Sequence, residues 1–236
     1  MTTMDLRTGT SGFSYKAWKG NFYPEDLAND KMLAYYGERL TAVEINNTFY
    51  RLPKASVLEG WAEKVPKPFR FSIKASRRIT HFKRLKQPVD ETAYLTETVG
   101  VLGERLGALL FQLPPNFKQD VERLTDFLEL LPEGTPAAFE FRHASWFDDA
   151  TFEALAGRNC ALCIADAGGE ADTPRVATAD WGYLRLRREE YSEADLADWH
   201  GWILQQSWSH AMAFFKHEDA GAGPRMAAGF LELGSG

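Results

Sequence analysis

Residues 42–46 read AVEIN, and this five-residue stretch decides how the rest of the sequence is interpreted. Val43 and Ile45 alternate with Glu44 and Asn46. Successive side chains of a β-strand point to opposite faces, so one face of this strand is apolar and the other polar. In a barrel of parallel strands the apolar face packs on surrounding helices and the other face points inward. The stretch therefore predicts a barrel strand with polar side chains at its carboxyl end.

The same alternation recurs in three further stretches, and together with the first it defines an inward face. They are residues 69–74 (FRFSIK), 137–142 (AAFEFR) and 182–187 (GYLRLR). Each places bulky apolar residues on one face and charged or hydroxyl-bearing residues on the other.

Strand-like and helix-like segments alternate along the whole chain. Apolar runs predict strands at 6–11, 42–46, 69–74, 107–112, 137–141, 160–166, 182–187 and 212–216. Helical periodicity marks 26–38, 55–64, 91–104, 119–130, 148–156, 193–206 and 225–233. Strands that alternate with helices pair in parallel through right-handed crossovers. The sequence therefore predicts an α/β fold, a (β/α)8 TIM-type barrel, as a single domain over residues 1–236.

Two details refine this prediction. Residues 167–181 (AGGEADTPRVATADW) carry turn residues and no helical stripe, so the crossover helix between strands six and seven is expected to be missing. An open doubly wound sheet is the alternative fold, and it usually carries GxGxxG after its first strand. This chain has TGTSGF at 8–13 instead.

Polar residues gather at or near the carboxyl ends of the predicted strands, where a barrel of this type has its active-site mouth. They are Glu44, Asn46, Lys74, Gln112, Glu140, Arg142, Asp166, Arg185, Arg187 and Lys216. One interpretation is that internal ion pairs cap the barrel core. Because burying charges costs several kcal/mol each even when they are paired, a functional site explains the whole set better.

Residues 73–86 (IKASRRITHFKRLK) hold six Lys or Arg residues, one His and no acid, although the chain has a formal charge of −6. The segment begins at Lys74 and fills the loop after the third predicted strand. It is either a solvated loop or a rim that attracts a negatively charged ligand to the mouth.

Composition limits the classes of partner and the cellular compartment that the sequence allows. An acidic chain, with 33 acidic and 27 basic residues, is not expected to coat nucleic acid broadly. Two cysteines give no disulfide framework, and no apolar run approaches the roughly 18–20 residues of a membrane span. A cytoplasmic protein without membrane partners is therefore expected. No nicotinamide, flavin or pyridoxal signature is evident, and the oligomeric state is not indicated.

Six blocks of the sequence together resemble a known family. They are GTSGFSYKAWKGNFYP, VEINNTFYRLP, ITHF, LGALLFQLPP, FEFRHASW and FFKHEDAGAGP. In this order they are similar to the YecE-like family, the domain of unknown function 72. The resemblance covers nearly the whole chain and implies a TIM-type barrel. It implies little about activity, and the layout is similar to endonuclease IV and xylose isomerase, which suggests phosphodiester or sugar chemistry only by analogy.

The chain departs from the family pattern in two places. Arg187 and Arg188 stand where the family tends to have His-Gly, and Met226 stands where it often has Asn. Roles that belong to that His or Asn therefore do not transfer to this chain.

Candidate catalytic residues are three carboxylates on the predicted mouth and one histidine. Glu44, Glu140 and Asp166 are expected either to transfer protons, to hold Mg²⁺ or Mn²⁺, or only to form ion pairs with the basic residues Lys74, Arg142 and Arg185. His143 is either a proton shuttle or a hydrogen-bonded residue that orders its own loop. The metal content is left open, and a zinc site that uses His81, His143 or His217 has no supporting HxH or HExxH spacing.

Substrate binding is assigned to the other members of the set and to two aromatics. The predicted binding residues are Asn46, Tyr50, Lys74, Gln112, Arg142, Trp146, Arg185, Arg187 and Lys216. Tyr50 and Trp146 would stack on a base or sugar, or else form an apolar lid. Gly221 and Gly223, just before a helix expected to begin at Pro224, mark either a phosphate site or a turn. Cys160 and Cys163, three apart on a strand, are expected to diverge into the core.

Three functions remain open from the sequence. The first is an enzyme of hydrolase or lyase type that acts on an anionic small molecule or short nucleic acid, phosphorylated or nucleotide-like. The second is a non-catalytic module that binds a nucleotide or nucleic acid. The third is a metal-assisted sugar isomerase or epimerase.

Overall fold

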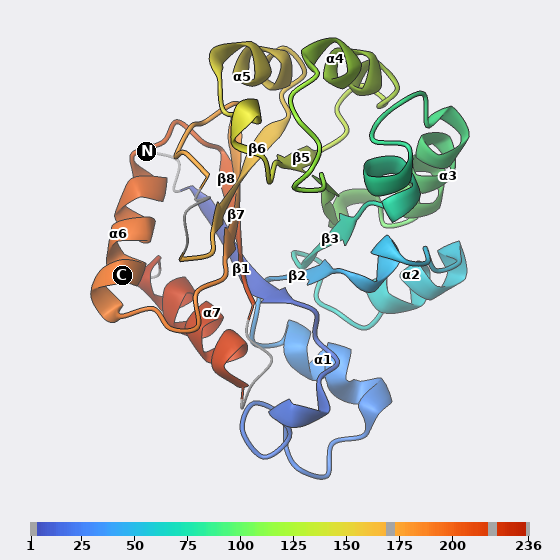
Figure 1. The fold of residues 1–236 in the computed structure, drawn as a ribbon. Coiled ribbons are helices and arrows are strands. Elements are labelled where there is room, and N and C mark those ends of the chain that lie inside the picture. Colours follow the sequence, from blue (N-terminus) through green and yellow to red (C-terminus); the bar gives the residue numbers. More distant parts are fainter. Residues whose placement is uncertain (1–3, 169–172, 217–220, 235–236) are drawn as a thin grey trace.

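The computed structural model describes residues 4–168, 173–216 and 221–234, and its strands form one closed barrel (Figure 1). Neighbouring strands all pair in parallel, and β1 pairs with both β2 and β8 to close the sheet. The strands are β1 (Asp5–Ser11), β2 (Ala42–Ile45), β3 (Arg70–Lys74), β4 (Leu106–Gln112), β5 (Ala137–Glu140), β6 (Ala161–Asp166), β7 (Trp181–Leu186) and β8 (His210–Phe215). The predicted TIM-type barrel is confirmed.

Helices surround the barrel and follow the strands in turn (Figure 1). They are α1 (Met32–Gly37), α2 (Ala55–Ala62), α3 (Val89–Gly100), α4 (Val121–Glu129), α5 (Asp149–Ala156), α6 (Glu193–Leu204) and α7 (Ala222–Leu233). Between β6 and β7, residues 167–168 and 173–180 contain no helix, as the missing apolar stripe predicts. No helix within the described ranges has both the length and the apolar character to cross a membrane.

Local sequence explains where several helices begin. The side chain of Ser192 accepts a hydrogen bond from the Asp195 backbone N–H at 3.1 Å, and Asp195 Oδ2 accepts one from the Ser192 backbone N–H at 2.9 Å. This capping box satisfies two backbone donors at the start of α6. At the other end of the chain, α7 begins at Ala222, so Pro224 is its third residue and not its first as predicted. Pro224 still lies in the first turn, where a backbone N–H would have no intrahelical partner.

Two apolar clusters separate the faces of the strands. Large residues such as Phe71, Phe111 and Phe139 belong to the cluster between the barrel and its helices. The barrel interior holds a smaller cluster that includes Leu110 and Phe214. Cys160 lies in the outer cluster and Cys163 in the inner one, which confirms that the two thiols diverge into the core.

Candidate functional site

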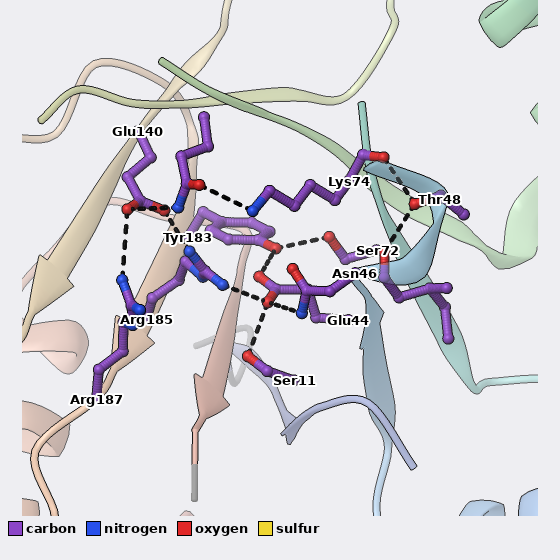
Figure 2. A network of polar contacts seen from close by, with 12 residues as sticks. Ser11, Glu44, Asn46, Thr48, Ser72, Lys74, Glu140, Tyr183, Arg185 and Arg187 are labelled. Carbon is purple, nitrogen blue, oxygen red and sulfur yellow. Dashed lines mark hydrogen bonds and ion pairs between the residues drawn. The ribbon is translucent and has the colours of Figure 1, made fainter. Parts of the chain in front are cut away.

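The alternation in the strands brings a polar layer together inside the barrel, near the carboxyl ends of the strands (Figure 2). Glu44 lies in register with Ser72 of β3, and Gln112 with Glu140 of β5. Parallel strands end at the same edge of a sheet, so side chains of one parity converge there. Hydrogen bonds and ion pairs link the predicted residues Glu44, Asn46, Lys74, Gln112, Glu140, Arg142, Arg185 and Arg187 in one network.

Arg185 is the centre of this layer because it binds two carboxylates at once. Its Nη2 lies 2.9 Å from Glu44 Oε1, and its Nη1 donates to Glu140 Oε2. The three side chains are between 0% and 3% exposed, so the triad is fully desolvated. One guanidinium thus forms an ion pair with each of two carboxylates that would be costly to bury without a partner.

Hydroxyl and amide donors complete the shell of Glu44. Ser11 Oγ and Asn46 Nδ2 donate to its Oε1 at 2.8 and 2.9 Å, and Tyr183 OH donates to its Oε2 at 2.7 Å. The hydroxyl of Tyr183 is in turn 2.6 Å from Ser72 Oγ. With several donors to one carboxylate, the ionised form of Glu44 is strongly preferred.

The pKa values of the triad follow from these contacts. Burial raises the pKa of Glu44, but the Arg185 charge and the hydrogen bonds from Tyr183 and Asn46 outweigh it and lower the pKa below its usual value. The same competition, with burial opposed first by Arg185 and then by the Gln112 hydrogen bond, lowers the pKa of Glu140 to about 2. Both carboxyls are therefore ionised near pH 7 and are poor proton donors.

Lys74 lies above the triad at the end of β3. Its Nζ donates to Gln112 Oε1 at 2.8 Å, and Gln112 Nε2 donates to Glu140 Oε1 at 2.9 Å (Figure 2). Its ammonium also lies 4.6 Å from the centre of the Phe49 ring. Burial, together with the nearby Arg185 charge, lowers the pKa of Lys74 to about 8. Lys74 therefore exchanges a proton much closer to neutral pH than an exposed lysine does.

Two arginines flank Glu140 at longer range. Arg142 Nε lies 3.8 Å and Arg187 Nη1 lies 3.7 Å from Glu140 Oε1. Their side chains are 40% and 18% exposed, so both reach toward solvent from the buried triad. Lys216 follows β8 and is also exposed.

Asp166 does not belong to this layer, and its predicted place on the mouth face is wrong. In β6 the inward residues are Ala161 and Cys163, which belong to the interior cluster, so Asp166 has the opposite parity. Its Oδ1 accepts from Arg188 Nε at 2.8 Å, and its Oδ2 accepts from Trp199 Nε1 at 3.2 Å. Asp166 therefore ties the end of β6 to α6 and to the loop after β7.

Trp146 is likewise not available to a ligand. It is 0% exposed, stacks on Phe141 with ring centroids 4.6 Å apart, and donates from Nε1 to the Phe117 carbonyl at 2.7 Å. The aromatic character that suggested stacking on a base instead serves the packing of the loop after β5. Tyr50 differs, because it is 67% exposed on the loop after β2.

His143 adopts the loop-ordering arrangement. Its Nδ1 accepts from the Ser145 backbone N–H at 3.2 Å and lies 2.8 Å from Ser145 Oγ. These contacts cap a short helical turn, Ala144–Trp146. A proton-transfer role for His143 stays a prediction.

No metal centre is formed by the residues that can be placed. Within residues 4–168, 173–216 and 221–234, no three His, Cys, Asp or Glu side chains are grouped so that they could hold a metal ion. His217 and the residues up to Ala220 lie outside the described residues, so the predicted zinc and phosphate roles of that loop are not described. Gly221, which follows it, has φ 73° and is the N-cap residue of α7.

The site residues predicted from the sequence do not include Tyr183, Ser11 and Ser72, whose hydroxyl groups take part in the network. Tyr183 has the same parity as Arg185 in β7, so the alternation already places it inside the barrel. The polar set predicted near the strand ends held only charged and amide side chains, so this hydroxyl was left out of it.

Comparison with known proteins gives a consistent family. The model of the family described as "Protein of unknown function DUF72" matches residues 7–235. The chain is 25% identical over 255 residues to the UPF0759 protein YunF of Bacillus subtilis, covering 90% of each chain. It is 32% identical over 116 residues to the UPF0759 protein YecE of Escherichia coli K12, covering 49% of this chain and 43% of that protein.

Solved structures agree in fold. A DUF72 family protein from Thermotoga maritima superposes with a TM-score of 0.87 at 29% identity, covering 98% of this chain and 100% of the other. A DUF72 family protein from Enterococcus faecalis superposes with a TM-score of 0.79 at 18% identity, covering 99% and 98%. At that identity the second likeness concerns the fold alone.

Proposed function

This chain belongs to the DUF72 family of proteins of unknown function, and we propose that it is an enzyme of hydrolase or lyase type acting on an anionic, phosphorylated or nucleotide-like substrate at the barrel mouth. One observation carries the proposal. The polar layer contains four cations, Lys74, Arg142, Arg185 and Arg187, against two carboxylates, Glu44 and Glu140. With Lys74 protonated, the formal excess is two positive charges.

The excess charge is directed toward solvent. Arg185 is buried and ion-paired with both carboxylates. The other three cations are partly exposed on the outer side of the layer: Arg142, Arg187 and Lys74. Low-dielectric walls focus such a field and attract a small anion. A cavity of about 410 Å³ adjoins Asn46 between the loops after β1 and β2, and it offers room for the uncharged part of a substrate.

Within this proposal the residues divide into two roles. Lys74, with its pKa of about 8, is the proton acceptor or donor that operates near neutral pH. Glu44 and Glu140, which are held ionised by Arg185, orient that arginine and the Gln112–Lys74 pair. Arg142 and Arg187 bind the anionic group of the substrate.

Thermal unfolding in the presence of inorganic phosphate tests the anion site. Millimolar phosphate should raise the melting temperature of the wild type by mass action. Arg187→Gln should lose most of that shift, and Lys67→Met, a lysine just before β3 at the opposite end of the barrel, should retain it. A melting temperature that does not change with phosphate would contradict the proposal.

Amine labelling tests the role of Lys74. At pH 8 an acylating reagent should modify Lys74 earlier than the exposed lysines, with a reactivity midpoint near pH 8, and phosphate should slow the reaction. Peptide mass mapping after short exposure measures both. Labelling of Lys74 at the rate and pH of Lys67 would remove it as a proton-transfer residue.

A non-catalytic binding module is the second candidate, and a specific observation favours it. The two buried carboxylates are both ion-paired with Arg185, so neither is a ready partner for Lys74 in general acid–base chemistry. Incubation with a panel of phosphomonoesters, phosphodiesters and nucleotides separates the two. Saturable binding with no product formed would favour the module, whereas turnover that Lys74→Met abolishes would favour the enzyme.

A further inference from the structure

Two aromatic side chains stand exposed on the rim beside the mouth. Tyr50 and Phe82 are each 67% exposed, more than any other large apolar side chain among the residues the structure describes. Tyr50 follows a short helical turn after β2, Asn47–Phe49, and Phe82 ends another turn after β3, Arg78–Phe82. Exposing aromatic surface to water is unfavourable, and a group of exposed apolar side chains is typical of a binding site.

An arginine holds the two rings together. The guanidinium carbon of Arg77 lies 5.2 Å from the Tyr50 ring centre and 5.3 Å from the Phe82 ring centre. Cation–π contacts at this range fix both rings relative to one positive charge. Tyr50, Arg77 and Phe82 form what we call the rim platform.

The rim platform continues into the mouth without a break. Phe49 packs edge-on against Tyr50 at 5.1 Å and against His81 at 4.8 Å. The Lys74 ammonium lies 4.6 Å from the centre of the Phe49 ring, and Lys74 donates a hydrogen bond to Gln112 in the buried network. A ligand that stacks on the rim platform would therefore have a neighbouring group close to Lys74.

Charge around the rim platform selects the ligand. Residues 73–86 contain six cations and no acid. Lys83 is partly neutralised by Glu91 at 2.8 Å, and Arg84 hydrogen-bonds Asn116 at 3.2 Å. Arg77 lies against both rings, and both Arg77 and its neighbour Arg78 are exposed. Aromatic faces interleaved with cations are the arrangement that binds bases and phosphates of unpaired nucleic acid. A neutral glycan would not need the cations, and an acidic peptide would not need the rings.

We propose that the rim platform is a stacking site for single-stranded nucleic acid, with bases on Tyr50 and Phe82 and the backbone phosphates on Arg77 and Arg78. The strand would lead one phosphate toward Lys74, and in this respect the inference rests on the proposed function of the mouth. A duplex does not fit, because its bases are already stacked and paired.

Fluorescence anisotropy with a labelled twelve-residue oligothymidylate tests the inference. Its matched probe is a twelve-unit abasic strand with the same number of phosphates. The wild type should bind the oligothymidylate at least about tenfold more tightly than the abasic strand, since only the former has bases that stack on the two rings. Equal binding of the two strands, equally tight binding of a duplex, or no binding would overturn the proposal.

Variants locate the site. Tyr50→Ala combined with Phe82→Ala should remove the preference for bases, whereas Tyr94→Ala, which removes an aromatic that is 56% exposed on α3, should not. The melting temperature of each variant without ligand reports whether it is folded. Retention of the base preference by the folded double variant would overturn the rim platform.

Two readouts separate this inference from the proposed function. The phosphate-induced melting shift belongs to the mouth and should survive in the Tyr50→Ala, Phe82→Ala variant. If that shift is present in the wild type but the oligothymidylate preference is absent, the nucleic-acid site on the rim platform is contradicted and the anion site at the mouth is supported.

Sedimentation velocity tests whether a second copy of the chain, and not nucleic acid, covers the rim platform. A dimer in the wild type that the double variant abolishes would overturn the nucleic-acid assignment.

Discussion

Arg185 forms ion pairs with two buried carboxylates at once, so its removal should cost more than the loss of an ordinary ion pair. Arg185→Met should lower the free energy of unfolding at pH 7 by about 3–5 kcal/mol, because Glu44 and Glu140 are left as uncompensated buried charges. Arg142→Met, which removes a 40% exposed arginine near the same carboxylate, should change it by no more than about 0.5 kcal/mol. Urea unfolding of the wild type and the two variants measures both effects. Equal losses would mean that the triad is not the main charge balance of the barrel.

Glu140 links the stability of the fold to acid. Its pKa in the folded protein is about 2, against an ordinary value of 4.5, chiefly because the Arg185 charge outweighs burial. A carboxyl with a lowered folded pKa contributes stability that is present above about pH 4.5 and is lost as the pH falls toward 2. The difference in unfolding free energy between wild type and Glu140→Gln should therefore shrink over this range.

Urea unfolding at several pH values between 2 and 7 measures the shrinkage. Glu63→Gln, on the exposed end of α2, is the control and should run parallel to the wild type. A wild-type minus Glu140→Gln difference that stays constant from pH 5 to pH 2 would mean that Glu140 is not held ionised by Arg185.

At the scale of residues, alternation along strands predicted the convergence of Glu44, Glu140 and Arg185. Asp166 was predicted on the mouth from its position at the end of β6, although Leu162 and Ile164, the bulky residues of that strand, share its parity and pack on the outer face. The prediction that Trp146 binds a ligand was wrong for a different reason. An aromatic after a strand either covers the core or faces a ligand, and only packing against Phe141 decides between them.

The basic segment after β3 is held in place by its apolar residues and not by its charges. Ile79 and Leu85 are 0% and 1% exposed, whereas Arg77 and Arg78 are exposed. Ile79→Ala or Leu85→Ala should therefore lower the free energy of unfolding by about 2–5 kcal/mol. Arg77→Gln and Arg78→Gln should each change it by less than about 0.5 kcal/mol.

Thermal or urea unfolding of the four single variants compares the two groups. If the arginine variants lost as much free energy of unfolding as the apolar variants, the arginines would be part of the structural contacts of the fold. Their charges would then not be available to bind a ligand. This comparison also provides the stability baseline for binding experiments on the rim.

Element positions were easier to predict than element shapes. The missing helix before β7 follows from a segment without an apolar stripe. The conformation of the basic segment does not follow from its pattern, because Arg84, Leu85 and Gln87 adopt positive φ values of 48°, 63° and 45°. Non-glycine residues adopt that region only where surrounding contacts compensate for the strain, and sequence spacing does not reveal such contacts.

At the scale of the molecule, the barrel was predictable because the pattern of each strand and of most crossover helices can be recognised locally, and eight parallel strands close a sheet. Function was not, since one fold supports many chemistries and the site is made by side chains from different strands. Glu44, Glu140 and Arg185 come from β2, β5 and β7, and the sequence gives no contact between them before the barrel closes.

The last helix covers the seam between β1 and β8 where the barrel closes. The α7 helix packs on β1 and β8, with Ala227 and Phe230 both 0% exposed, and Thr8 Oγ1 of β1 donates to the Ala227 carbonyl at 2.9 Å. A chain that ends at residue 221 would expose the outer face of the β1–β8 seam to water. Because a barrel has no stable edge there, we expect this truncation to lose cooperative thermal unfolding and near-ultraviolet circular dichroism. Removal of residues 235–236 alone, the matched control, should leave both signals unchanged. A cooperative transition in the shorter chain would mean that the β1–β8 pairing closes the barrel without its covering helix, and that the mouth network survives on strand pairing alone.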